Sequence, residues 1–179
     1  LYIYLIIDYI KLFMKILNIA IIIVSDTRTH ETDKSGRKLV DLISGEGHVI
    51  VTKDIVKDNI YEIRKVASDF ILNSEIDAII LSGGTGITGS DGTPEAIEPL
   101  LDKVIEGFGE LFRLKSFEKI KTSSLQSRAL AGVANSTFVF VLPGSVDACK
   151  TAWNEIISHQ LNSNTKPCNL VMLMPRLKE

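Results

Sequence analysis

The chain has 179 residues, of which 45% are hydrophobic and 23% are charged, and its formal net charge is −2. A chain of this length and composition is typical of one globular domain whose core needs no disulfide bonds. The near-neutral charge excludes the basic face of an electrostatic nucleic-acid binder, so no nucleic-acid partner is predicted. The two cysteines, Cys149 and Cys168, have no metal-ligand spacing, which indicates free thiols in a cytoplasmic protein.

The apolar N-terminal run raises the question of a membrane span. Asp8, Lys11 and Lys15 interrupt the run, and a charge at the centre of a span costs about 2.5–3.5 kcal/mol on insertion scales. No basic region or small-residue cleavage site marks a signal peptide. We therefore predict no stable membrane association. We interpret residues 1–13 as an extension, or as a misassigned start that is not native, and residues 14–179 as the functional domain.

Apolar runs and helical periodicity alternate in the first half of the chain. Residues 16–24 form an apolar, β-branched run, typical of a parallel strand that is buried on both faces. After a polar loop at 25–36, we expect a helix that ends near Gly45 or Gly47. A strand at 48–56, a helix after the predicted N-cap Asp58 and a buried strand at 76–82 follow.

The second half continues the same alternation. The predicted elements are a helix from Thr93 to about Lys103, further helix from Gly107 to Gly132 broken near Lys121, a strand at 136–145, a helix at 146–161 that buries Trp153, and a short strand at 170–174. Strands that alternate with helices build right-handed βαβ units. The sequence therefore predicts an α/β fold, a three-layer α/β/α sandwich with a mainly parallel sheet.

Three polar loops follow predicted strands, at 25–28, 82–95 and 143–145. In open α/β sheets, ligands bind beyond the carboxyl ends of the strands, so these loops are expected to converge on one site. The candidate binding residues in them are Ser25, Ser82, Gly83, Gly84, Thr85, Gly86, Thr93, Pro94, Glu95, Pro143, Gly144 and Ser145.

The glycine-rich loop is the strongest of these signals. Gly83, Gly84, Gly86 and Gly89 permit positive φ and close approach of a ligand to the backbone. Successive amide N–H groups in such a loop bind anions, and the helix that opens at Pro94 points its positive end toward the same region. The spacing is neither that of a P-loop nor that of a dinucleotide fingerprint. A phosphate is the predicted guest, and a flexible turn without a ligand is the alternative.

Two aspartates accompany this loop. Asp91 lies between the glycines and the next helix, and Asp58 follows another strand. Carboxylates beside a phosphate imply a shared cation, and Mg²⁺ binds one or two carboxylates together with phosphate oxygens. Both are therefore candidate catalytic and metal-binding residues. The alternatives are that Asp58 only caps a helix and that Asp91 only forms a turn.

Polar residues in the following segments are weaker candidates. Glu110 lies in a glycine-containing stretch before a predicted helix, although it can also pair with Arg113 on the helix surface. Ser127 and Arg128 come next, and an arginine suits bidentate recognition of phosphate.

Several motifs occur together in a fixed order. They are SGGTG at 82–86, Asp91 with TPEA at 93–96, GFGE at 107–110, SLQSRALAGV at 124–133, and LPGS at 142–145 followed by ACKTAW at 148–153. As a set they resemble the MoaB/Mog family of molybdenum-cofactor biosynthesis proteins, over about residues 15–170. The stretch SHQLNSNTKPCN is most similar to the bacterial MoaB branch.

The resemblance implies a mainly parallel sheet, assembly as a homotrimer or homohexamer, and molybdopterin binding. In catalytic members the terminal phosphate of molybdopterin attacks the α-phosphate of Mg-ATP, which yields adenylyl-molybdopterin and pyrophosphate. Carried over by position, SGGTG holds phosphate, Asp58 and Asp91 serve Mg²⁺ and the reacting phosphates, and Ser145 lines the pterin pocket.

Three functions remain open at this point: a molybdopterin adenylyltransferase, a molybdopterin carrier without catalysis, and a nucleotide-binding domain outside the pathway. The Asp-x-Thr-Pro pattern at Asp91 favours catalysis. The loop continues with ITGS in place of basic residues, which leaves the affinity for nucleotide open.

Overall fold

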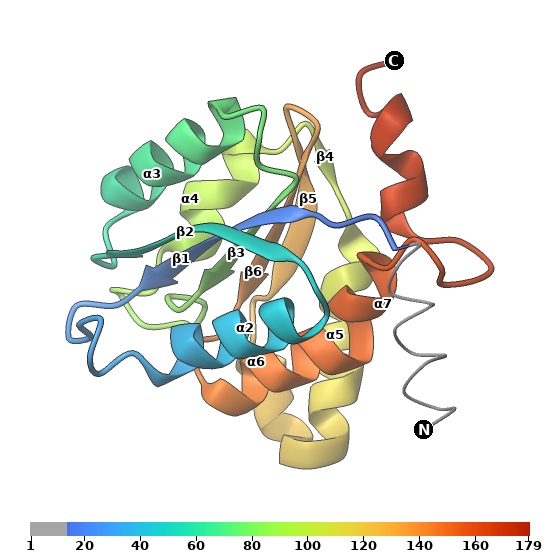
Figure 1. The fold of residues 1–179 in the computed structure, drawn as a ribbon. Helices are drawn as coiled ribbons and strands as arrows, with labels where there is room; N and C mark the ends of the chain where they lie inside the picture. Colours follow the sequence, from blue (N-terminus) through green and yellow to red (C-terminus); the bar gives the residue numbers. More distant parts are fainter. Residues whose placement is uncertain (1–13) are drawn as a thin grey trace.

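A computed structural model describes residues 14–179 as one six-stranded sheet with helices on both faces (Figure 1). The predicted extension, residues 1–13, lies outside the described residues. The strands are β1 (Asn18–Val24), β2 (Val49–Val56), β3 (Ala78–Ser82), β4 (Lys103–Val104), β5 (Leu130–Ala134) and β6 (Thr137–Leu142). The α-helices are α2 (Lys34–Gly45), α3 (Ile60–Leu72), α4 (Thr93–Ile97), α5 (Glu106–Ile120), α6 (Val146–Ala152) and α7 (Ser158–Gln160).

The strand order in the sheet is β2-β1-β3-β6-β5-β4. The first four strands in this order are parallel, and β5 and β4 are added antiparallel. Ile23 of β1 pairs with Ser82 of β3, which pairs with Leu142 of β6, so these strands end level with one another. The prediction of a mainly parallel α/β sheet is confirmed, and the three polar loops leave the same edge.

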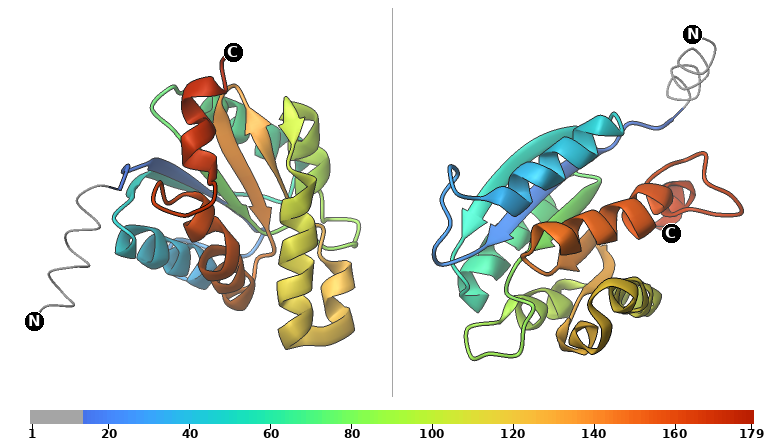
Figure 2. Two further views of the ribbon diagram at one scale, coloured as in Figure 1. Left: turned by 90° about the vertical axis from the view of Figure 1, so that its right-hand side faces the viewer. Right: turned by 90° about the horizontal axis from the view of Figure 1, so that it is seen from below.

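The two faces of the sheet carry separate hydrophobic cores. Side chains alternate along β1, so Ile21 packs in the core beneath α2, α5 and α6, whereas Ile22 packs in the core beneath α3. Figure 2 shows α2 and α6 side by side on one face. Trp153, predicted to be buried, is 1% exposed in the first core. None of the helices within residues 14–179 is long and apolar enough to cross a membrane.

The segment between β3 and β6 differs most from the predicted helices. The helix that begins at Thr93 ends at Ile97, continues as a 3₁₀ turn and leads into β4 at Lys103–Val104. The predicted helix to Gly132 was wrong beyond Gln126, because β5 pairs antiparallel with β6. Small residues give β5 no strand signal of its own, and a Cβ on Gly132 would lie 2.6 Å from the carbonyl oxygen of Lys103.

Other predicted elements also differ from those in the structure. Asn59, not Asp58, caps α3, since its side chain accepts hydrogen bonds from the amides of Tyr61 and Glu62. Residues 170–174 are not a strand but part of the 3₁₀ helix Leu170–Arg176, which Asn169 caps. The predicted 146–161 helix is present, with the π-helical turn Trp153–Ile157 inside it.

Candidate anion-binding site at the carboxyl edge of the sheet

A cavity of about 770 Å³ runs along the carboxyl edge of the sheet. The loops after β1, β3 and β6 form one side of it, and α5, α6 and the 3₁₀ helix Lys121–Gln126 form the other. Of the predicted site residues, the cavity is lined by Ser25, Ser82, Gly83, Gly84, Thr85, Gly86, Asp91, Ser127, Pro143, Gly144 and Ser145. The three loops therefore converge, as the strand pattern predicted.

Two glycines of the loop after β3 have backbone conformations that residues with a side chain rarely adopt. Gly83 has φ +119° and Gly84 has φ +63°. A Cβ on Gly83 would lie 2.1 Å from the carbonyl oxygen of Val24, and one on Gly84 would lie 2.3 Å from Oγ1 of Thr93. Both positions therefore require glycine.

Two amides of this loop are left for a ligand. The Gly83 amide donates to the carbonyl of Leu142 at 2.9 Å, and the Gly86 amide faces the carboxylate of Asp91. Among residues 14–179, the amides of Gly84 and Thr85 have no acceptor. We call residues 83–86 the cradle. Because α4 has only five residues, the cradle depends on loop amides rather than on the helix end that the sequence suggested.

Arg128 holds the outside of the cradle. Its Nε donates to the carbonyl of Gly86 at 2.7 Å, and its Nη2 donates to the carbonyl of Asp91 at 2.8 Å. Its Nη1 pairs with the carboxylate of Glu95. Neither Arg128 nor Glu95 lines the cavity. These two residues were predicted to bind phosphate or substrate; in the structure, three of the five guanidinium N–H donors of Arg128 brace the loop and pair with Glu95.

The two aspartates differ in their electrostatics. The amide and hydroxyl of Thr88 donate to Oδ2 of Asp91 and hold the pKa of Asp91 below its usual value. Burial raises the pKa of Asp58, the Gly92 amide at 3.2 Å opposes this, and the charge of Asp91 adds to the rise. Each negative charge therefore makes the other less favourable until a cation joins them.

Asp58 lies behind the cradle rather than in the cavity wall. A Cβ on Gly84 would come within 2.7 Å of its Oδ2, and this oxygen accepts no hydrogen bond from any described residue. Asp91 faces the cavity directly. An acidic pair with an unused oxygen next to an anion cradle fits Mg²⁺, which prefers carboxylate and phosphate oxygens.

The remaining predicted residues have structural positions. Thr93 is fully buried, and its hydroxyl donates to the carbonyl of Gly83 at 2.8 Å. Pro94 is buried at the start of α4. Glu110 is exposed on α5, which begins before the two glycines, and it does not line the cavity. Ser145 lines the cavity and caps α6, because its Oγ accepts from the amide of Ala148 at 3.1 Å.

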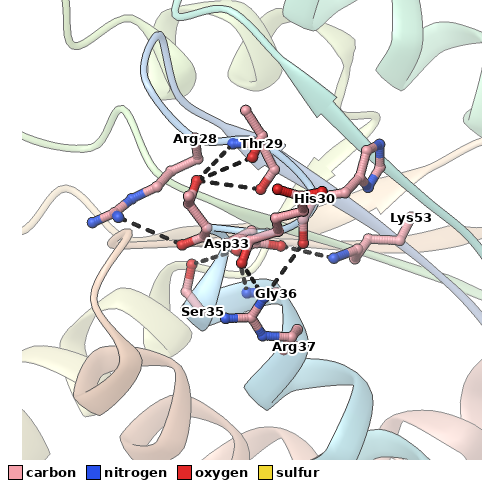
Figure 3. Close-up of polar contacts among 10 residues, drawn as sticks. Arg28, Thr29, His30, Asp33, Ser35, Gly36, Arg37 and Lys53 are labelled. Atoms are coloured by element: carbon pink, nitrogen blue, oxygen red, sulfur yellow. Dashed lines mark hydrogen bonds and ion pairs between the residues drawn. The ribbon is translucent and has the colours of Figure 1, made fainter.

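A buried ion pair anchors the loop after β1, and the sequence analysis did not identify it. Asp33 is 0% exposed, and its carboxylate accepts from Nζ of Lys53 at 2.8 Å and from the Gly36 amide at 2.7 Å. Burial alone would raise the pKa of Asp33, but Lys53 and the Gly36 amide hold it below its usual value. In Figure 3 this carboxylate lies between Lys53 and the start of α2. Arg37 Nη1 donates to the carbonyl of Glu31 in the same loop.

The sequence analysis also missed much of the cavity wall. The missed residues that line the cavity include Arg28, Ser116, Lys119, Ser123, Gln126 and Thr151. They come from a surface loop, α5, the following 3₁₀ helix and α6. Single polar residues on helix surfaces carry no motif, so only their position in the fold shows their relation to the cradle.

Residues 20–163 match the family described as "Probable molybdopterin binding domain". The chain belongs to this molybdopterin-binding family. Molybdenum cofactor biosynthesis protein B of Escherichia coli K12 is 50% identical over 161 residues, which cover 90% of this chain and 93% of that protein. The Bacillus subtilis protein of the same name is 44% identical over 142 residues, which cover 79% and 84%. The family resemblance expected from the motifs is confirmed.

Solved structures agree with this membership of the molybdopterin-binding family. A crystal structure of Molybdenum cofactor biosynthesis protein B superposes with a TM-score of 0.77 at 38% identity and covers 92% of each chain. The tungsten cofactor synthesizing protein MoaB from Pyrococcus furiosus superposes with a TM-score of 0.75 at 33% identity, over 92% of this chain and 99% of that one. These superpositions confirm the family fold for this chain.

Proposed function

We propose that this protein acts in molybdenum cofactor biosynthesis by binding molybdopterin with the terminal phosphate in the cradle. The observation that carries this proposal is the pair of free amides at Gly84 and Thr85, two residues that line a cavity of about 770 Å³. Pockets of this volume accommodate cofactor-sized molecules. Membership of the molybdopterin-binding family supports the choice of ligand.

We further propose that the bound molybdopterin is adenylylated by Mg-ATP. A phosphate oxygen of molybdopterin forms a bond to the α-phosphorus of ATP. The bond from that phosphorus to the bridging oxygen breaks, and pyrophosphate leaves with the electron pair. Such a transfer requires positioning and charge neutralisation and needs no covalent nucleophile.

The residues divide this work. The cradle amides bind and orient the attacking phosphate, and Arg128 keeps the cradle in shape through the carbonyls of Gly86 and Asp91. Asp58 and Asp91 would hold Mg²⁺, which, when bound, supplies positive charge to the phosphate oxygens. Ser145 lines the cavity at the start of α6, and we expect it to contact the pterin part.

One observation favours a second candidate, a molybdopterin carrier that does not catalyse transfer. Arg128, next to the cradle, donates to loop carbonyls and pairs with Glu95, so these contacts would have to break before it could bind the phosphates of a nucleotide. In that case the protein would bind molybdopterin and release it unchanged.

Pyrophosphate release separates the two candidates. The purified protein is incubated with molybdopterin and Mg-ATP, and we expect pyrophosphate in proportion to adenylyl-molybdopterin. Asp91→Asn should abolish this release and leave the circular dichroism spectrum unchanged. Tight pterin binding without pyrophosphate would establish the carrier. Full activity of Asp91→Asn would remove Asp91 from the mechanism.

We also propose that the protein assembles as a homotrimer or homohexamer in the cytoplasm. Leu111, Leu114, Phe117 and Ile120 on α5 are 47–59% exposed, and a free monomer would keep this apolar surface in water. Light scattering coupled to gel filtration tests the assembly, and a monomeric mass at micromolar concentration would contradict it.

A further inference from the structure

The part of the cavity away from the sheet has its own chemical character. Its walls come from α5, the 3₁₀ helix Lys121–Gln126 and α6. We call it the α5 wing and define it by six polar residues, Ser116, Lys119, Ser123, Gln126, Ser127 and Thr151. Since the cradle lines the same cavity, one ligand can place its phosphate in the cradle and its organic part in the α5 wing.

Lys119 presents its ammonium to this wing in a fixed direction. Its Nζ donates to Oγ1 of Thr151 at 2.9 Å. The Thr151 hydroxyl in turn donates to the carbonyl of Asp147 at 2.8 Å, so Oγ1 can only accept from the lysine. Thr151 is 3% exposed, which fixes this anchor. Two of the three N–H donors of Lys119 remain for a ligand.

The positive charge of Lys119 has no counter-charge within the described part of the chain. The seven ion pairs among residues 14–179 do not include it. Asp147, which also lines the cavity, pairs at 3.7 Å with Lys150. The α5 wing therefore offers one ammonium group without a counter-charge, among neutral hydroxyl and amide groups.

Ser127 provides an independent sign of a ligand in this wing. Its Oγ is buried and has no hydrogen-bond partner within residues 14–179. A buried hydroxyl without a partner is unfavourable, because it has lost its hydrogen bonds to water. Ser127 lines the same cavity as the cradle and Gln126, so a ligand that reaches from the cradle into the wing could supply the missing partner.

We propose that Lys119 selects the pterin by donating to the carbonyl oxygen of its oxo-pyrimidine ring. This inference rests on the proposed function. A pterin edge presents one carbonyl acceptor next to ring and exocyclic N–H donors, which matches one ammonium among groups that can accept. An adenine edge presents an exocyclic amino donor instead of the carbonyl, and an ammonium cannot accept from it. The α5 wing thus holds the pterin, and the nucleotide binds elsewhere along the cavity.

A pair of synthetic ligands tests the selection directly. The phosphate ester of 6-hydroxymethylpterin is compared with its 2,4-diamino analogue, in which an amino group replaces the carbonyl, by fluorescence titration of the full-length protein. We expect the wild type to prefer the oxo compound about tenfold or more, as for hydrogen bonds to charged groups. Lys119→Met should lose this preference by weakening the oxo compound alone.

Lys115→Met is the matched control on the same helix. Lys115 pairs with Glu118 and Glu155 and does not line the cavity, so this variant should keep the preference. An unchanged preference in Lys119→Met, or a loss confined to ATP affinity, would overturn the assignment while pterin binding itself stands. Competition by inorganic phosphate reports on the cradle separately. A wild type that binds neither pterin ester would overturn the proposed function as well.

Discussion

The loops after β1 and β3 leave the same edge of the sheet, yet side chains anchor the first and backbone geometry shapes the second. The loop after β1 ends at Asp33, whose buried carboxylate pairs with Lys53 of β2. The loop after β3 turns through two glycines with positive φ, and Arg128 grips its carbonyls from outside.

This difference implies that the loop after β1 serves the stability of the fold, whereas the loop after β3 also serves ligand binding. The carboxylate of Asp33 is satisfied inside the fold and has nothing left for a ligand. The cradle keeps the amides of Gly84 and Thr85 free, because Arg128 braces the loop through the carbonyls of Gly86 and Asp91. Changes at the first loop should therefore act on folding, and changes at the second should act on binding as well.

Gly83→Ala should have the largest effect. The new Cβ would meet the Val24 carbonyl oxygen at 2.1 Å, at a φ of +119°. Backbone strain and overpacking together should cost about 4 kcal/mol of unfolding free energy. Urea denaturation measures the loss, and titration with pyrophosphate measures the damage to the cradle.

Gly107→Ala is the control for this substitution. Its new Cβ would have no neighbour within 4 Å in the described structure, and the residue lies inside α5. It should stabilise the protein by about 0.5–1 kcal/mol through helix propensity. Equal destabilisation by both variants would show that the positive-φ conformation at Gly83 is not required.

Lys53→Met should destabilise the fold by about 3 kcal/mol, because it leaves the fully buried carboxylate of Asp33 without its cation. This is the lower end for buried pairs, since the Lys53 side chain is 17% exposed. The ionised form of Asp33 is favoured by folding, so its stabilisation is present above the unfolded pKa and is lost as the pH falls through the lowered folded pKa. The gap between variant and wild type should therefore narrow in acid.

Lys65→Met is the matched comparison, because its pair with Asp69 is exposed. It should change the unfolding free energy by less than about 0.5 kcal/mol. If phosphate affinity falls in Lys53→Met as much as in Gly83→Ala, the proposed separation between the two loops is incorrect.

Arg128→Met should cost about 1–2 kcal/mol of stability and about tenfold in pyrophosphate affinity, because the carbonyls of Gly86 and Asp91 lose their donors. Hydrogen exchange should become faster for the amides of residues 85–91. Arg128→Lys restores the charge without the fork of donors and should recover little. Full recovery of affinity by lysine, with unchanged exchange, would mean that the charge of Arg128 acts on the ligand directly.

Asp58→Asn should have the smallest effect on stability, and with the opposite sign. Because the folded pKa of Asp58 is raised, its protonated carboxyl group favours folding below the unfolded pKa, and this advantage is lost as the pH rises through the folded pKa. The variant should therefore melt at or above the wild-type temperature at pH 7, and the difference should vanish in acid. Pyrophosphate release should be lost. A variant that melts at a lower temperature than the wild type at pH 7 would contradict the raised pKa of Asp58.

Much of the sheet and of the cradle was predictable because local signals agreed with the tertiary structure. The apolar runs at 16–24 and 76–82 became β1 and β3, and the glycines at 83–86 formed the cradle after β3. Strand ends and positive-φ glycines are local properties of the chain, which explains this success.

The remaining features depend on contacts that are distant in sequence. β5 is a strand only because β6 lies beside it. Arg128 resembles a phosphate ligand until the fold places the carbonyl of Gly86, 42 positions earlier, against its Nε. The Asp33–Lys53 pair spans 20 positions and has no motif, and Lys119 meets the cavity only through the packing of α5 beside α6.

The two cysteines offer the experimenter a single handle for labelling. Cys149 lies under Pro143 with its sulfur 3.3 Å from Oγ of Ser82, and burial raises the pKa of its thiol to about 11. Cys168 is exposed and does not line the cavity. Maleimide reagents attack the thiolate, so a dye should attach at Cys168 alone, and fluorescence studies can proceed on the native chain without a cysteine-free background.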